Sequence, residues 1–272
     1  MTRLAFPDYL SHLRGESARF REVLSGCDPT ARVPACPDWD AGDLLWHLAH
    51  VQWFWATTMR RRPAGPDGTD AVPDRPTSHT GLLAAFDEFS AMLAGELQTA
   101  DPAEQAWSWA AEQSVGFTFR RQAHEALIHR LDAEQTAGQV TGLDAALAAD
   151  GVAELLEVMY GGPPAPWARF EPGSGLVRVV LSDVGVDLWA QPGLFLGTDP
   201  ESGTVHDGPH LLLLDAPEDG DGHGDGHGAR ISGTAADLDA WLWKRRDGAG
   251  ITRTGDEAAL TAFDAAVGFP ID

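Results

Sequence analysis

Apolar positions recur at helical spacing along the first 160 or so residues of the chain. Large apolar side chains fall three or four positions apart in several stretches, and turn residues separate these stretches. The predicted helices are residues 5–25, 40–58, 80–97, 114–138 and 143–160. Asp40, followed three positions later by Asp43, predicts the N-cap of the second of them. The first four, amphipathic and within about 140 residues, predict a helical bundle, and the fifth closes this part of the chain.

The pattern changes after Trp167. The runs "LVRVVL", "VDLWA" and "HLLLLDA" are short, aliphatic or β-branched and bounded by turn residues, which is typical of strands. Helical patterns follow in "SGTAADLDAWLWKRR" and "DEAALTAFDAAV". The stretch "GGPPAPW" marks the change, so we predict a bundle domain over residues 1–162 and a smaller α+β domain over 163–272.

A low-complexity segment, "PEDGDGHGDGHG", interrupts the second domain. Its His223 and His227 could bind a metal ion weakly, but its composition favours a disordered hairpin tip. We expect deletion of residues 220–228 to leave folding and activity nearly unchanged, because the segment has no residue able to build a core.

Composition narrows the classes of function. A formal net charge of −22 repels nucleic-acid phosphates and anionic membrane surfaces, so we expect neither as a partner, although Arg60, Arg61 and Arg62 form a local basic patch. The chain has no apolar run long enough to span a bilayer and no signal-peptide pattern, which predicts a cytoplasmic protein. Cys27 and Cys36 are expected to be thiols rather than a disulfide, and their spacing is not that of a zinc site.

Candidate chemistry begins with Glu125 and His129 on the stretch 114–138. Four residues apart on a helix, they project from the same face one turn apart, where they can chelate a cation if a neighbouring helix adds a third ligand. His124 lies on a different face and cannot join them. Together with Thr118 and Gln122 they lie away from the apolar side, so they face either solvent or a polar cleft. The residues that define the apolar side are Phe119, Ala123, Ala126, Leu127 and Leu131.

The stretch "GDLLWHLAHVQWFW" carries two further histidines, His47 and His50. His47 shares a face with Leu44 and Phe54, which turns it inward or toward a cleft wall, and a buried imidazole needs a hydrogen-bond partner or a metal. Taken alone, the polar residues of either helix are explained without a metal, by a solvated salt-bridge face or by a core histidine with a hydrogen-bond partner. The combination favours a metal site, because bundles build such sites from facing helices. Two histidines and one carboxylate leave an open position, as in catalytic zinc or iron sites.

Three motifs together resemble the mycothiol-dependent maleylpyruvate isomerase family, within the DinB-like metalloenzymes. They are "PACPDWDAGDLLWHLAHV", "RRQAHEALIHRLDAE" and "ISGTAADLDAWLWKRR". The resemblance implies a DinB-like four-helix bundle whose metal ligands are His47, Glu125 and His129, with His50 outside the triad. It implies a C-terminal domain similar to sterol-carrier-like folds, with Arg245 as the arginine that faces the active cleft. Lys244 stands where the family usually has glycine, and a second arginine, Arg246, follows Arg245. The family's arginine could therefore correspond to either Arg245 or Arg246.

The resemblance also implies a chemistry. A divalent metal, with zinc as the expected ion, and a low-molecular-weight thiol, with mycothiol as the expected one, would serve cis–trans isomerisation or S-transfer. The substrate would be a small unsaturated or electrophilic molecule bearing a carboxylate, which Arg245 would hold bidentately, although a surface cation explains this arginine equally well. Actinobacterial genomes carry many members of this family, so the motifs do not name the substrate. A monomer or a small homo-oligomer fits.

Two other classes remain open. The chain could be a non-catalytic small-molecule or lipid-binding protein, with "HLLLL" and "WLW" forming the walls of an apolar tunnel in the second domain. It could also be a regulatory protein that has lost its activity, against which the intact triad of motif residues weighs. Metal content separates the enzyme from the carrier, because a carrier needs no metal.

Overall fold

The computed structural model describes residues 2–68, 71–217, 228–269 and 271. It divides into two compact units, Leu4–Leu143 and a second made of Met1–Arg3 with Asp144–Asp272. The segment with His223 and His227 lies outside the described residues. None of the described helices is both long and apolar enough to cross a membrane.

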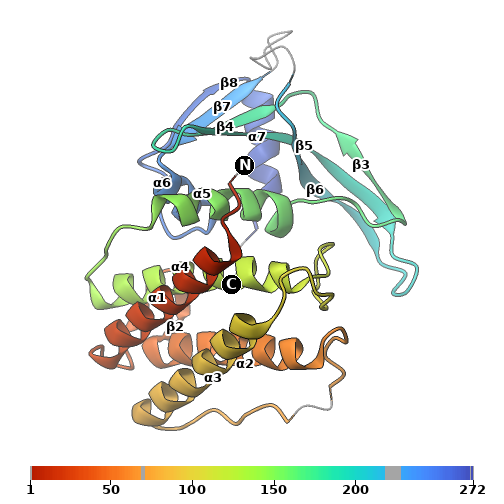
Figure 1. Ribbon diagram of the computed structural model, residues 1–272. Coiled ribbons are helices and arrows are strands. Elements are labelled where there is room, and N and C mark those ends of the chain that lie inside the picture. Colours follow the sequence, from red (N-terminus) through yellow and green to blue (C-terminus); the bar gives the residue numbers. More distant parts are fainter. Residues whose placement is uncertain (1, 69–70, 218–227, 270, 272) are drawn as a thin grey trace. The chain divides into compact units, whose positions relative to one another are not determined.

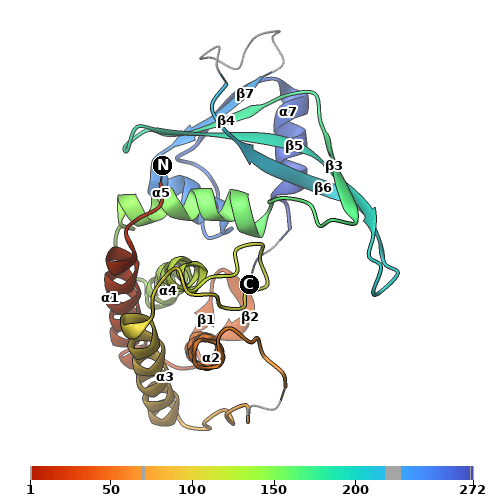
Figure 2. The ribbon, with the colours of Figure 1, turned by 45° about the vertical axis from the view of Figure 1, so that its right-hand side comes forward.

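The first unit is the predicted helical bundle (Figure 1). Its helices are α1 (Phe6–Ser25), α2 (Ala41–Arg61), α3 (His79–Thr99) and α4 (Val115–Ala137), and a short hairpin is formed by β1 (Arg32–Val33) and β2 (Cys36–Asp40). Helix α1 packs along α4, and α2 packs along α3 and also contacts α4. Figure 2, which looks nearly along α2, shows the hairpin beside α2 and α4. Cys27 and Cys36, at the two ends of the loop region after α1, form no disulfide in the described structure.

Side-chain caps fix the helix ends that position the site. The Asp40 carboxylate accepts from the backbone N–H of Asp43 at 2.8 Å, and the Asp43 carboxylate accepts from the N–H of Asp40 at 3.0 Å. Ser114 caps α4 by accepting from the N–H of Phe117, and Gly138 ends it with φ of 68°, a conformation that glycine adopts at no steric cost. These local signals confirm the predicted starts of α2 and α4 and the end of α4.

Helix α4 is the most buried element of the bundle. Apart from Glu125 and its last three residues, every side chain from Val115 to Ala137 is buried, including charged ones. Of the two alternatives for Glu125 and His129, solvent or a polar cleft, burial excludes solvent: the His129 side chain is 1% exposed and that of Glu125 12%. Hydrophobic periodicity does not predict the burial of α4, because charged side chains on α4 are buried in ion pairs with charged residues of α1. The spacing of apolar residues carries no information on such pairs.

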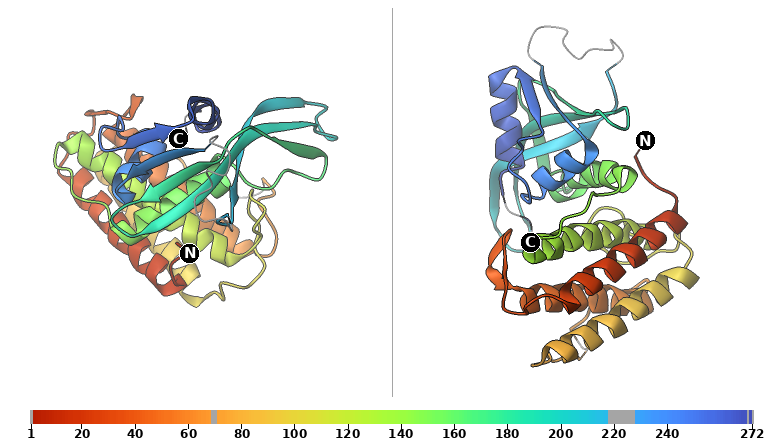
Figure 3. Two further views of the ribbon diagram at one scale, coloured as in Figure 1. Left: turned by 90° about the horizontal axis from the view of Figure 1, so that it is seen from above. Right: turned by 90° about the vertical axis from the view of Figure 1, so that its left-hand side faces the viewer.

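The second unit is α+β. Its elements are α5 (Ala145–Glu154), the π-helical turn η1 (Leu155–Met159), β3 (Ala168–Pro172), β4 (Val177–Leu181), β5 (Val186–Thr198), β6 (Val205–Leu214), β7 (Ala229–Gly233), α6 (Ala235–Leu242), β8 (Thr252–Gly255) and α7 (Glu257–Ala266). The sheet order is β3-β5-β4-β7-β8, and β6 pairs with the other edge of β5. Only β4 and β7 run parallel among these described pairs. Helix α7 packs on β4, β5, β6 and β7 (Figure 3).

The division between the units differs from the predicted boundary after residue 162. Helix α5 belongs with the α+β unit because it packs against α6. Gly151 of α5 lies so close to Asp239 of α6 that an added Cβ would be 2.7 Å from the carboxylate oxygen. The sequence places the fifth helix beside the fourth by chain order alone, and chain order carries no information on which neighbour it packs against.

Candidate metal centre

Three side chains from two helices of the bundle converge on one point. His47 comes from α2, and Glu125 and His129 come from α4. One ligand atom of each lies within 4.8 Å of the other two. The Oε1 atom of Glu125 is 3.2 Å from Nε2 of His129 and 3.6 Å from Nε2 of His47. The structure thus brings together the three residues that the sequence singled out.

These distances fit a tetrahedral ion. Ligands that each lie about 2.1 Å from a tetrahedral zinc are about 3.4 Å from one another. The separations of Oε1 of Glu125 from the two histidine nitrogens, 3.2 and 3.6 Å, bracket that value. Two imidazoles and one carboxylate also leave one tetrahedral position for a water, a thiol or a substrate.

Asp132 sets the tautomer of His129. Its Oδ2 atom lies 3.0 Å from Nδ1 of His129, and both side chains are buried. A carboxylate there makes Nδ1 the protonated nitrogen, so the Nε2 lone pair points at Oε1 of Glu125. Two acceptors facing each other at 3.2 Å repel, unless a proton or a metal ion lies between them.

The pKa values of the pair report the same conflict. Burial alone would lower the pKa of His129, but hydrogen bonding to Asp132 and Glu125 raises it above its ordinary value. Burial alone would raise the pKa of Glu125, but its contacts with His129 and His47 and the charge of Arg121 hold it well below its ordinary value. Without a metal ion, these contacts therefore favour the protonated form of His129 and the ionised form of Glu125.

Arg121 orients the second oxygen of Glu125. Its Nη2 atom donates to Oε2 at 3.2 Å, one helical turn before Glu125 on α4. This contact leaves Oε1 directed at the two histidines, because each carboxylate oxygen then has its own partner.

His47 supplies the unsatisfied ligand atom. Its Nε2 is buried and has no hydrogen-bond partner among the described residues. The ring packs on Trp39 of β2, with a centroid separation of 4.7 Å, and lies edge-on to His129 at 4.8 Å. A buried imidazole nitrogen without a hydrogen-bond partner fits coordination to a metal ion.

The other two histidines of these motifs lie outside the cluster. His50 stacks between Trp46 and Trp53, at interplanar angles of 29° and 19°. Burial, and secondarily the nearby His47, lowers the pKa of His50, so its ring is neutral. His124 packs edge-on against Tyr9, in agreement with its expected place on another face of α4.

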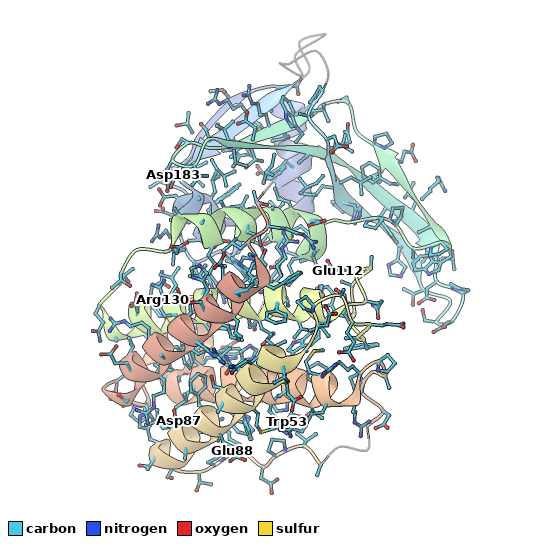
Figure 4. The ribbon with its side chains drawn as sticks, in the orientation of Figure 1. Trp53, Asp87, Glu88, Glu112, Arg130 and Asp183 are labelled. Carbon is cyan, nitrogen blue, oxygen red and sulfur yellow. The ribbon has the colours of Figure 1, made fainter. Side chains whose placement is uncertain are left out.

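An ionic network anchors the end of α4 that carries His129. Arg130, labelled on α4 in Figure 4, donates to Glu16 of α1 at 2.7 Å and to Glu134 at 3.0 Å. Glu134 also accepts from Arg19 of α1 and from the backbone N–H of Thr141. Buried charges that are fully paired hold the helix in one register, and with it the spacing of the site residues.

Arg245 lies in the other unit, just after α6. The residue is 8% exposed, and its guanidinium donates from Nη1 to the carbonyls of Trp243 and Ile271 and lies over the Trp243 ring. Lys244 has φ of 62°, a conformation that costs a lysine energy and a glycine none. Lys244 therefore occupies a position whose backbone suits glycine. Arg246 pairs with Asp237 at 2.7 Å.

Sequence reasoning missed Asp132, Arg121 and Trp39. The first two were within reach: Asp132 is three residues after His129, and Arg121 four before Glu125, so both lie on neighbouring turns of the same face. Trp39 precedes the helix and reaches His47 only through the hairpin, which no spacing rule predicts.

Two family models match the chain. Residues 10–134 match the model for the mycothiol maleylpyruvate isomerase N-terminal domain, and residues 146–262 match the model for the C-terminal domain of the same family. No curated protein matches the chain.

Solved structures of similar fold are the mycothiol-dependent maleylpyruvate isomerase and a histidine-to-alanine mutant of it. Both are 14% identical in sequence, and each comparison covers 92% of this chain and 93% of the other, with TM-scores of 0.55 and 0.53 respectively. At that identity the likeness concerns the fold. Taken with the two family models, which between them match most of the chain, it shows that this protein belongs to the mycothiol-dependent maleylpyruvate isomerase family of enzymes.

Proposed function

We propose that the chain is a metal-dependent enzyme that uses a low-molecular-weight thiol, with mycothiol as the expected one, for cis–trans isomerisation or S-transfer. The observation that carries the proposal is the convergence of three ligand atoms, Nε2 of His47, Oε1 of Glu125 and Nε2 of His129, all within 4.8 Å of one another. The Nε2 atom of His47 is buried and has no hydrogen-bond partner among the described residues. Zinc is the expected ion, since two imidazoles and a carboxylate suit it.

The protein's residues prepare the site in three ways. His47, Glu125 and His129 would hold the ion, Asp132 keeps the metal-facing nitrogen of His129 unprotonated, and Arg121 directs Glu125. A divalent cation bound here would stabilise the thiolate form of a thiol at neutral pH, which supplies a soft nucleophile without a protein cysteine. Cys27 and Cys36 lie in or beside the loop after α1, outside the metal cluster. Their positions agree with an external thiol, rather than a protein cysteine, as the nucleophile.

A carboxylate on the substrate would need a cation, and we propose Arg245 for it. Its support is the match of its motif to the family and the glycine-like backbone of Lys244 before it. Its planar guanidinium binds a carboxylate by two parallel hydrogen bonds, which a lysine ammonium does not.

A metal analysis joined to a thiol-dependent assay tests the proposal. Purified protein should hold close to one divalent ion per chain, measured by elemental analysis, and should isomerise maleylpyruvate or conjugate an electrophile only when mycothiol is present. Protein reconstituted with zinc that retains no ion after gel filtration would refute the metal site. Full metal content with no thiol-dependent turnover on any unsaturated acid or electrophile would refute the chemistry.

The carrier alternative finds less support. Leu211, Leu242 and Trp243, from the segments that could form the walls of an apolar tunnel, are packed in the core of the α+β unit at 0%, 0% and 2% exposure. Their apolar character is explained by that packing.

A further inference from the structure

A line of polar side chains extends from the metal centre along α4. Thr118, Gln122, Glu125 and His129 fall within an arc of about 60° at 100° per residue, so they share one face of the helix. Thr118 and Gln122 are 0% and 1% exposed. The face therefore continues, enclosed and polar, for two turns beyond the ligands towards the start of α4.

The two outer members of this line are unsatisfied. The Thr118 hydroxyl and both the Nε2 and Oε1 atoms of Gln122 are buried and have no hydrogen-bond partner among the residues that the structure describes. Burying such groups without partners destabilises the folded protein. Further along the same helix, the buried Arg130 and Glu134 each have several partners. Thr118 and Gln122 thus place three buried polar atoms without a described partner on the face that carries Glu125 and His129.

We propose that Gln122 and Thr118 bind an amide group of the thiol cosubstrate. This inference rests on the proposed function. A glutamine side chain offers N–H donors and a carbonyl acceptor, so it forms a reciprocal pair of hydrogen bonds with a ligand amide. A ligand carboxylate would satisfy the N–H groups but leave Oε1 of Gln122 unpaired. The Thr118 hydroxyl both donates and accepts, and it can take the amide's remaining lone pair or a neighbouring hydroxyl.

The spacing agrees with a cysteine-derived thiol. Gln122 precedes Glu125 by three residues, a rise of about 4.5 Å along the helix. In such a thiol two carbon atoms separate the sulfur from the amide nitrogen. A sulfur at the metal centre therefore places the amide beside Gln122, and the rest of the molecule beside Thr118 one turn further on.

Two thiols that differ by one group test the proposal. N-acetylcysteine and 3-mercaptopropionate share the thiol, the chain and the carboxylate, and only the first carries an acetamido group. Titration calorimetry on the zinc-loaded full chain should show that N-acetylcysteine binds roughly 10-fold or more tightly than 3-mercaptopropionate. In Gln122→Leu that preference should disappear, and in Thr118→Val it should fall, while metal content stays at the wild-type level.

Stability supplies a second readout. Gln122→Leu and Thr118→Val replace unsatisfied buried groups by apolar ones of similar size, so each should keep or raise the unfolding temperature of the protein without thiol. Gln52→Leu and Thr58→Val are matched controls, since their side chains already donate to Ser17 and to the Phe54 carbonyl. Both controls should retain the preference for N-acetylcysteine, and Gln52→Leu should lower the unfolding temperature.

The outcomes separate this inference from the function on which it rests. If wild-type protein binds both thiols equally, or if Gln122→Leu keeps the preference, the amide does not bind Gln122 and the inference is overturned, while the metal–thiol function stands. If the zinc-loaded wild type binds neither thiol, the proposed function fails, and the inference fails with it.

Discussion

At the scale of single residues, the site is decided by which nitrogen of each imidazole is free. Asp132 fixes His129, and Trp39 packs against His47, so two lone pairs and one carboxylate oxygen face a common point. His50 is only three residues from His47, yet its ring is stacked between two tryptophans and directed elsewhere.

The two histidines of α2 should therefore differ in substitution. His47→Ala should abolish metal retention, because two ligands on one helix do not hold an ion against exchange. His50→Ala should keep most of the metal. Elemental analysis after gel filtration measures both, and equal loss in the two variants would mean that His50 is also a ligand.

An isosteric substitution tests the role of the Asp132 charge. Asp132→Asn keeps the side-chain volume but removes the charge that holds the Nδ1 proton of His129. Metal affinity should fall about 10- to 100-fold, as for other partners of metal-bound histidines. Competition with a chelator measures the change, and an unaltered affinity would show that the histidine is oriented by packing alone.

Metal affinity should also depend on pH with a definite sign. Contacts with Asp132 and Glu125 outweigh burial and raise the pKa of His129, so a proton competes with the ion near neutrality. The apparent affinity should rise as pH increases through that raised pKa and then level off. Chelator competition between about pH 6 and about pH 8 measures this, and a flat profile would contradict a protonated His129 in the metal-free site.

At the scale of elements, α4 is the support of the site, and buried ion pairs hold it to α1. Glu134 accepts hydrogen bonds from Arg19, Arg130 and Thr141, and burial opposes but does not cancel their lowering of its pKa. Such a network specifies one helix register because a shifted register would leave charges unpaired.

Breaking this network should be costly. Glu134→Ala leaves the buried Arg130 short of a partner and should lower the free energy of unfolding by about 3 kcal/mol. The control is Asp87→Ala, which removes the exposed partner of Arg21 and should cost about 1 kcal/mol or less. Urea denaturation measures both. Similar small losses in the two variants would mean that the buried network does not fix the helix.

The same elements show what the sequence could predict. Helix starts at Asp40 and Ser114 and the end at Gly138 follow from local capping chemistry, and the chelating pair Glu125 and His129 follows from helical spacing. The burial of α4 does not follow, because its polar residues are matched by charges on another helix. The place of α5 does not follow either, since its partner α6 is some 90 residues further along the chain.

At the scale of the whole molecule, charge agrees with a small-molecule enzyme. The net charge of −22 disfavours nucleic acid, and the arginines at the end of α2 are paired with acidic groups: Arg60 with Glu96, and Arg62 with Glu104. The basic patch seen in the sequence is therefore neutralised locally.

Whether the α+β unit takes part in the reaction depends on Arg245. If Arg245 binds a substrate carboxylate, Arg245→Lys should keep metal content and fold but lower thiol-dependent kcat/KM by roughly 10-fold or more, because a point charge replaces a planar fork. Arg246→Lys is the matched control: Arg246 pairs with Asp237 in the folded unit, and a lysine can keep that partly exposed pair. Steady-state kinetics on both variants, with circular dichroism and metal analysis, separate the cases. A larger loss in Arg246→Lys would move the carboxylate-binding role by one residue. Equal and small losses would mean that the substrate carboxylate is bound by the bundle alone, and that the buried Arg245 only ties Trp243 to Ile271.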